Sequence, residues 1–140
     1  MVFPGKPISK DNRAEIGWVF AAGHRRRPVI RIPEKYVLWE AKIKIRALEQ
    51  IARDARFPIK SPIPVEVWIR FFYPYWPSAP DLHNSPKSFC DALNRVVWED
   101  DSQIWNSHLV KRVDAENPRI ELRLRIMDRK EIETNDAASC

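Results

Sequence analysis

The feature that most constrains the fold is a long helical repeat that follows a proline. Pro33 suits the first turn of a helix, and the acidic side chain of Glu34 complements the helix dipole. From about Glu34 to Asp54, apolar residues recur at steps of three and four, which places them on one helix face. They are Leu38, Ala41, Ile45, Leu48 and Ala52. Trp39 and Ile43 lie beyond this stripe, so we expect a helix that is covered on two sides.

Alternation of apolar and polar residues predicts strands on either side of a second helix. Val65–Phe72 points its odd-numbered apolar residues to one face, and Arg119–Ile126 repeats the pattern with even-numbered ones. Ile104–Val113 is typical of a further strand. Between these strands, Ser85 can cap a helix that runs to about Val96.

The N-terminal third gives weaker signals. Met1–Pro7 predicts a short strand, and Ile16–Ala22 a strand or hairpin. Val29–Ile32 is only a weak strand candidate, because a proline stands at each end. Together, the elements predict an α+β (mixed α/β) fold with a small mixed sheet and two main helices.

Length and composition fit one domain. We expect a single domain over residues 1–127 and a polar, flexible tail over 128–140. No segment approaches the roughly 20 apolar residues of a membrane span, and no secretory signal is expected. Cys90 and Cys140 do not have the spacing of metal ligands, which excludes a zinc ribbon and a disulfide scaffold. The chain is therefore expected in a reducing cytoplasm.

Charge is distributed unevenly along the chain. Residues 1–60 hold 14 Lys and Arg against 6 Asp and Glu, whereas residues 61–140 hold 10 against 13. A basic half suggests an anionic partner, of which nucleic acid is the first candidate, although many basic domains bind none. Arg25–Arg27 and Arg31 form the sharpest cluster, which is either a phosphate-facing loop or a solvated loop.

Candidate catalytic chemistry lies between Pro80 and Ile104. Asp81 and His83 flank Leu82, and an extended backbone would point both side chains the same way. Asp100 and Asp101 follow the predicted helix, and the connecting chain is long enough to return to the start of that helix. Carboxylates that meet beside a DNA phosphate need a cation, and Mg²⁺ or Mn²⁺ suits them.

Each of these residues also has an ordinary structural explanation. Asp81 can be a turn former, His83 a surface histidine, and the Asp100–Asp101 pair part of a turn. Lys87 and Asp91 lie four residues apart and can pair with each other. Spacing alone leaves these alternatives open.

The same segment resembles the RusA family of Holliday-junction resolvases. The resemblance rests on Asp81-Leu-His-Asn84, Lys87, Asp91-Ala-Leu93 and Trp98-Glu-Asp-Asp-Ser-Gln-Ile104. Pro4–Lys10 resembles the first strand and turn of that family, and the segment from Tyr36 resembles its first helix. Family members are homodimeric, Mg²⁺-dependent endonucleases of mixed α/β architecture that cut four-way DNA junctions by paired incisions, and many are encoded by phages or prophages.

The resemblance implies a role for each matching residue. Asp81 would be the first metal-binding aspartate, Lys87 the essential basic residue and Asp101 the last catalytic carboxylate, with Asp100 beside it. Asp91 would be structural. The catalytic candidates are thus Asp81, His83, Lys87 and Asp101, and the metal-ligand candidates Asp81, His83, Asp100 and Asp101. The candidate DNA-binding residues are Lys6, Lys10, Arg13, Arg25, Arg26, Arg27, Arg31 and Lys87.

Two departures from the family pattern matter. His83 stands where the second aspartate of Asp-x-Asp-Asn belongs, which removes a negative charge and favours Mn²⁺ or a later metal over Mg²⁺. The aromatic segment Tyr73–Pro80 replaces the basic residues of some members, and it would either stack on an unpaired base or pack at a dimer interface.

Three functions are compatible with the sequence. The first is a metal-dependent, structure-selective endonuclease of bacterial or phage origin that resolves four-way junctions as a homodimer. The second is a weakened or inactive relative that binds branched DNA without cutting it. The third is a protein-interaction domain that keeps only the fold.

Overall fold

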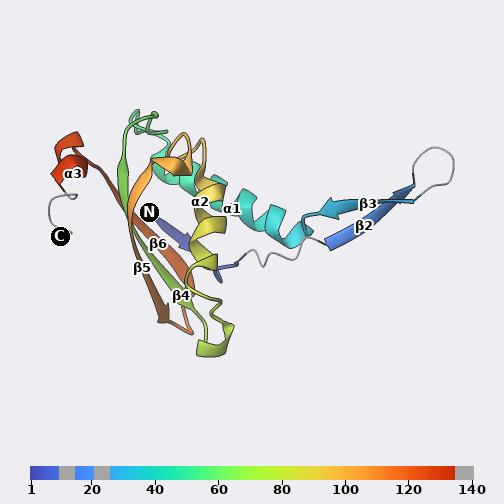
Figure 1. Cartoon of the computed structure of the whole chain (residues 1–140). Helices are drawn as coiled ribbons and strands as arrows, with labels where there is room; N and C mark the ends of the chain where they lie inside the picture. Colours follow the sequence, from blue (N-terminus) through green and yellow to red (C-terminus); the bar gives the residue numbers. More distant parts are fainter. Residues whose placement is uncertain (10–14, 21–25, 135–140) are drawn as a thin grey trace.

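A four-stranded mixed sheet forms the centre of the computed structural model, which describes residues 1–9, 15–20 and 26–134 (Figure 1). The strand order is β1-β6-β4-β5, with β4 parallel to β5 and antiparallel to β6, and β1 antiparallel to β6. The bounds are Val2–Pro4 for β1, Val65–Tyr73 for β4, Ile104–Val113 for β5 and Arg119–Ile126 for β6. The predicted α+β class is confirmed.

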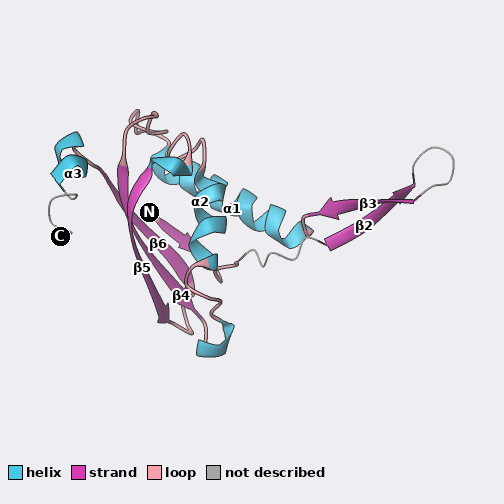
Figure 2. Ribbon diagram, in the orientation of Figure 1, coloured by secondary structure: helices cyan, strands magenta, loops and turns pink. Residues whose placement is uncertain are grey.

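The two main helices lie on the same side of this sheet (Figure 2). They are α1, Glu34–Ile51, and α2, Asn84–Leu93. Shorter elements connect and flank them: the 3-10 helices η1, Trp76–Ser78, and η2, Asp101–Gln103, and the helix α3, Arg129–Thr134. No helix in the described ranges is both long and apolar enough to cross a membrane.

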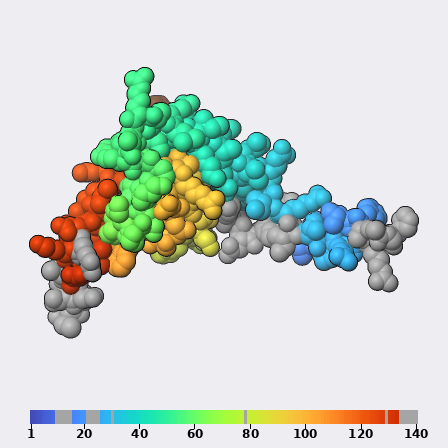
Figure 3. All heavy atoms as spheres, turned by 90° about the horizontal axis from the view of Figure 1, so that it is seen from above, coloured from blue at the N-terminus to red at the C-terminus, as the bar shows by residue number. Residues whose placement is uncertain are grey.

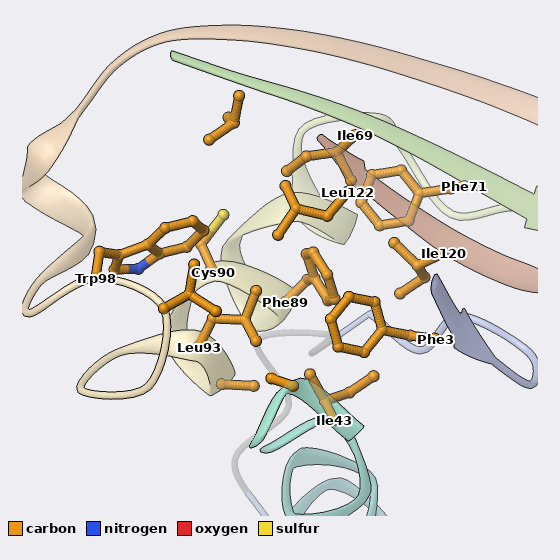
Figure 4. Packing of buried hydrophobic residues seen from close by; sticks show 14 of the residues in the cluster. Phe3, Ile43, Ile69, Phe71, Phe89, Cys90, Leu93, Trp98, Ile120 and Leu122 are labelled. Carbon is orange, nitrogen blue, oxygen red and sulfur yellow. The ribbon is translucent and has the colours of Figure 1, made fainter. Parts of the chain in front are cut away.

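The core fills the space between the sheet and the helices (Figure 4). The odd-numbered residues of β4, from Val65 to Tyr73, are fully buried, as the alternation predicts. Phe89 of α2 packs edge-on against Phe3 of β1, with ring centroids 5.1 Å apart, and against Phe71 of β4, at 6.2 Å. These contacts fix α2 on the sheet, and so fix the residues at its two ends.

Helix α1 packs against α2 and β1 with only one of its two apolar faces. The buried residues are Tyr36, Trp39, Ile43, Ala47 and Ile51. The predicted stripe from Leu38 to Ala52 lies on the opposite side of the helix, where Leu38, Ile45 and Leu48 are each more than half exposed. The expectation that both sides are covered is therefore wrong within one chain, because α2 and β1 pack against only the Trp39 side.

A hairpin arm projects from the body, formed by β2, Glu15–Phe20, and β3, Arg26–Arg31 (Figures 1 and 3). Arg26 and Arg27 thus lie in a strand, and the prediction of a loop is wrong for them. Pro28 lies inside β3 rather than at its end, which is tolerated because both strands of a two-stranded sheet are edges. Arg25 lies outside the described residues.

The segment predicted to be a flexible tail begins with α3. Arg125 of β6 binds Glu131 of α3, with a nitrogen–oxygen distance of 2.9 Å, which ties the helix to the sheet. Residues 135–140 lie outside the described part, so the domain boundary near residue 127 stays a prediction.

Candidate active site and nucleic-acid interface

The N-terminal end of α2 presents Asp81 and His83 to solvent. Residues 81–83 form a turn, in which the backbone N–H of Asn84 donates to the carbonyl of Asp81 at 3.1 Å. The extended backbone that would point both side chains the same way is therefore not found here. His83, not Ser85, is the N-cap residue, and its backbone is already helical.

Ser85 has a different role from the predicted cap. Its hydroxyl is buried and shares a hydrogen bond of 2.8 Å with the hydroxyl of Tyr73, at the end of β4. Burial raises the pKa of Tyr73, while the bond to Ser85 opposes that shift. The first turn of α2, and with it Asp81 and His83, is thereby attached to the end of the central strand.

A polar stripe runs along the outer side of α2. His83, Lys87 and Asp91 follow one another at four-residue steps, so they share one face, and both His83 and Lys87 are exposed. The opposite face buries Phe89 and Leu93 in the core. An anionic strand lying along α2 would meet this stripe.

The Asp-Asp-x-Gln motif builds η2. Asp100 is its N-cap: the carboxylate accepts from the backbone N–H of Ser102 at 2.9 Å, and these bonds lower the pKa of Asp100. The buried Gln103 side chain accepts from the N–H of Glu99 and Asp100 and donates to the carbonyl of Ile63 at 2.9 Å. One aspartate thus forms the turn, and the partly exposed Asp101 beside it is presented outward.

The 3-10 helix η2, which carries Asp101, contacts α2. Burial raises the pKa of the Cys90 thiol to about 12, and the nearby charges of Asp101 and Asp91 add to that shift. Cys90 is seven residues beyond His83, which corresponds to about 10 Å along the helix.

The metal-ligand candidates have suitable chemistry but are not gathered. Carboxylate oxygens suit Mg²⁺ and Mn²⁺, and an imidazole suits Mn²⁺ better than Mg²⁺. Yet within residues 1–9, 15–20 and 26–134, no three His, Cys, Asp or Glu side chains are grouped so that they could hold a metal ion. The meeting of Asp81 with the Asp100–Asp101 pair therefore stays a prediction.

The basic candidates fall on two separate surfaces. Lys6 and Lys87 are exposed on the body, and the ammonium group of Lys6 lies 5.7 Å from the ring centroid of Tyr75. Arg26, Arg27 and Arg31 are exposed on the hairpin arm. The remaining candidates, Lys10, Arg13 and Arg25, lie outside the described residues.

Sequence reasoning missed Lys111 and Arg112. Parallel pairing sets Val113 of β5 beside Tyr73 of β4, so the end of β5 meets the segment that leads to Asp81. Lys111 donates through Nζ to the carbonyl of Pro80 at 2.7 Å, directly before Asp81. Alternation along β5 predicts the strand but not its parallel partner, so no sequence signal placed this lysine near the site.

Of the two comparisons with known proteins, one identifies a family. The comparison with curated proteins gives no match. A family model described as Endodeoxyribonuclease RusA matches residues 4–125, a range that holds β4, β5, all but the last residue of β6, the arm, α1 and α2, and only the last residue of β1. With so much of the chain matched, including Asp81, Lys87 and Asp101, the protein belongs to the RusA family of endodeoxyribonucleases.

Proposed function

We propose that this protein is a metal-dependent, structure-selective endonuclease that resolves four-way DNA junctions by paired incisions. The family implies a nuclease that acts on Holliday junctions, binds branched DNA and depends on a divalent metal ion. The observation that carries the proposal is the retention of Asp81, Lys87 and Asp101 at accessible positions within the matched range.

The side chains suggest a division of roles. Lys87, on the outer face of α2, would hold the scissile phosphate and stabilise the charge that develops on it. Asp81, His83 and Asp101, with Asp100 beside them, are the proposed ligands of Mg²⁺ or Mn²⁺. Such an ion would supply an activated water. Because the described positions do not gather these donors, the full ligand set stays a proposal.

A junction-binding protein that does not cut is the second candidate. His83 places a neutral or cationic ring where a carboxylate would help hold the ion, which lowers the expected affinity for Mg²⁺. If this single change stops cleavage, His83→Asp would restore it without changing the affinity for junctions.

Paired incisions need two sites, and we propose a homodimer formed through the exposed face of α1. Leu38, Ala41, Ile45, Leu48 and Ala52 repeat at the three-and-four spacing of a coiled-coil seam. In an antiparallel pair, Lys42 on one edge of this seam would approach Glu49 on the same edge of the second copy. This charge complementarity and the exposed side chains favour a second copy of the chain. Leu38→Glu with Ile45→Glu would then yield a monomer in sedimentation.

The decisive experiment compares a labelled four-way junction with a matched linear duplex in Mg²⁺, Mn²⁺ or EDTA. We expect symmetric nicks in the junction alone, and only with a metal ion. Asp101→Asn should reduce the cleavage rate at least a hundredfold, a size typical of losing one transition-state-stabilising group, with junction affinity retained. Glu116→Gln, which also removes one exposed carboxylate, is the control and should cut normally. Cleavage by Asp101→Asn would contradict its assigned role.

A further inference from the structure

A cavity of about 430 Å³ opens beside the chain segment that leads to Asp81. It lies between the η1 segment and the end of β5, and its size falls within the roughly 300–1,000 Å³ of small-ligand sites. The lining residues are Trp76, Pro77, Ala79, Lys111, Arg112 and Val113. They combine one indole ring, apolar walls and two cations, and they include no acidic side chain.

Of the neighbouring rings of Tyr75 and Trp76, the ring of Trp76 is the one available to a ligand. Its side chain is 82% exposed, an unusual state for a tryptophan in a folded protein. The neighbouring Tyr75 already has Lys6 above its ring, at 5.7 Å. In contrast, the described residues place no ring or cation over Trp76. A large flat apolar surface is thus open on the wall of a basic cavity.

Both cations of the cavity lining donate hydrogen bonds to backbone carbonyls. Lys111 donates to the carbonyl of Pro80 at 2.7 Å, and Arg112 donates to the carbonyl of Lys111 at 3.0 Å. An ammonium has three donors and a guanidinium five, so both keep donors for an anion. An aromatic face beside fixed cations is the chemistry that binds a base together with its phosphates.

We propose that this cavity binds an unstacked nucleobase of the DNA strand, with the base on Trp76 and its flanking phosphates on Lys111 and Arg112. The inference rests on the proposed function and extends it with a substrate contact. Since Lys111 is bonded to Pro80, a base held here would place the adjoining backbone next to Asp81. A base can leave the stack at the centre of a four-way junction more easily than within a duplex, so the cavity would favour branched DNA.

The test is a cycle of changes in the protein and in the DNA, read by fluorescence anisotropy in EDTA so that cleavage plays no part. Junctions are prepared intact or with one abasic nucleotide at each position flanking the crossover. Trp76→Ala should weaken binding of the intact junction on the order of tenfold, and Trp76→Phe should recover most of that loss. On one of the abasic junctions, Trp76→Ala should have no further effect, because the base it would contact is absent. Trp105→Ala, which removes an exposed tryptophan outside the cavity, is the matched control and should bind the intact junction normally.

Two results would overturn the proposal directly, and a third would separate it from the proposed function. If Trp76→Ala weakens duplex and every abasic junction as much as the intact junction, Trp76 does not hold a base. If the variant is a monomer when the unmodified protein is a dimer, the cavity is a contact between subunits. If the unmodified protein shows no preference for junctions, the proposed function fails on its own. In that case, the unmodified protein and Trp76→Ala are compared on a single-stranded oligonucleotide. If the variant binds it as tightly as the unmodified protein does, the cavity does not bind a base.

Discussion

The body, which is the main sheet with its helices, buries its large apolar side chains, whereas the hairpin arm exposes its own. In the body, Phe71, Phe89 and Trp98 are fully buried between the sheet and the helices. In the arm, Ile16, Trp18 and Phe20 are 68%, 59% and 71% exposed. A two-stranded hairpin is at best marginally stable alone in water. The body can therefore be stable through its own burial, whereas the described residues leave the large apolar side chains of the arm uncovered.

The register of the arm separates two kinds of surface. Ile16, Trp18 and Phe20 lie on one face, and Arg26, opposite Phe20, places its guanidinium 5.3 Å from that ring. Arg27 and Arg31 lie on the other face, because the strand positions alternate. The arm thus has an aromatic face and a basic face, and both are available to a partner.

The largest expected effect comes from replacing a phenylalanine with alanine in each of the two regions. Phe89→Ala removes a ring that contacts Phe3 and Phe71, and it should lower the free energy of unfolding by about 3–5 kcal/mol. Phe20→Ala should change that free energy by less than about 0.5 kcal/mol. Urea denaturation followed by circular dichroism measures both. Equal losses in the two variants would mean that the arm belongs to the cooperative core.

A smaller effect is expected where the core meets the site. Ser85→Ala leaves the buried hydroxyl of Tyr73 without its partner, which should cost about 1–3 kcal/mol in the same assay. The double variant, Ser85→Ala with Tyr73→Phe, removes both hydroxyls. It should lower the free energy of unfolding less than Ser85→Ala alone. If the double variant instead loses the sum of the two single losses, the hydroxyls are not coupled.

The sequence could predict elements whose pattern is local. The bounds of β5 and β6 are those expected, β4 extends one residue further, and α1 begins at the expected residue. The buried side of α1 could not be predicted, because Trp39 and Leu38 belong to two different faces and both faces carry large apolar side chains at helical spacing. Only the positions of α2 and β1 decide between them, and these are a property of the tertiary structure.

The candidate site shows the same division. Its residues were found through a motif, and the motif is local. Their positions depend on the parallel pairing of β4 with β5, which brings Lys111 to Pro80, and on η2, which carries Asp101 and contacts α2. A parallel pair leaves no short-range signal such as a tight turn, so alternation could not place these residues.

The arm can be tested by its salt dependence. Arg26, Arg27 and Arg31, changed together to Gln, should lower the slope of log affinity against log salt by about 0.9 for each DNA phosphate that is no longer neutralised. The unfolding free energy should hardly change, since all three side chains are exposed. Lys60→Gln, an exposed cation on the body, is the control. An unchanged slope would remove the arm from the DNA interface and leave its aromatic face for a protein partner.

The smallest expected effect reports where Asp101 lies. The pKa of Cys90 is raised to about 12, first by burial and then by Asp101 and Asp91, while an unfolded thiol titrates near 9. Between these two pH values the folded state keeps the Cys90 proton and the unfolded state loses it. The contribution of Cys90 to the free energy of unfolding is therefore fully present below about pH 9 and is lost as the pH rises towards 12. Asp101→Asn removes one opposing charge and should lower the pKa of Cys90. Alkylation of Cys90 at pH 9–10, resolved from Cys140 by peptide mapping, should then be a few-fold faster than in the unmodified protein. An unchanged rate would place Asp101 away from Cys90 and nearer to Asp81, which would make the metal site more complete than the described positions allow.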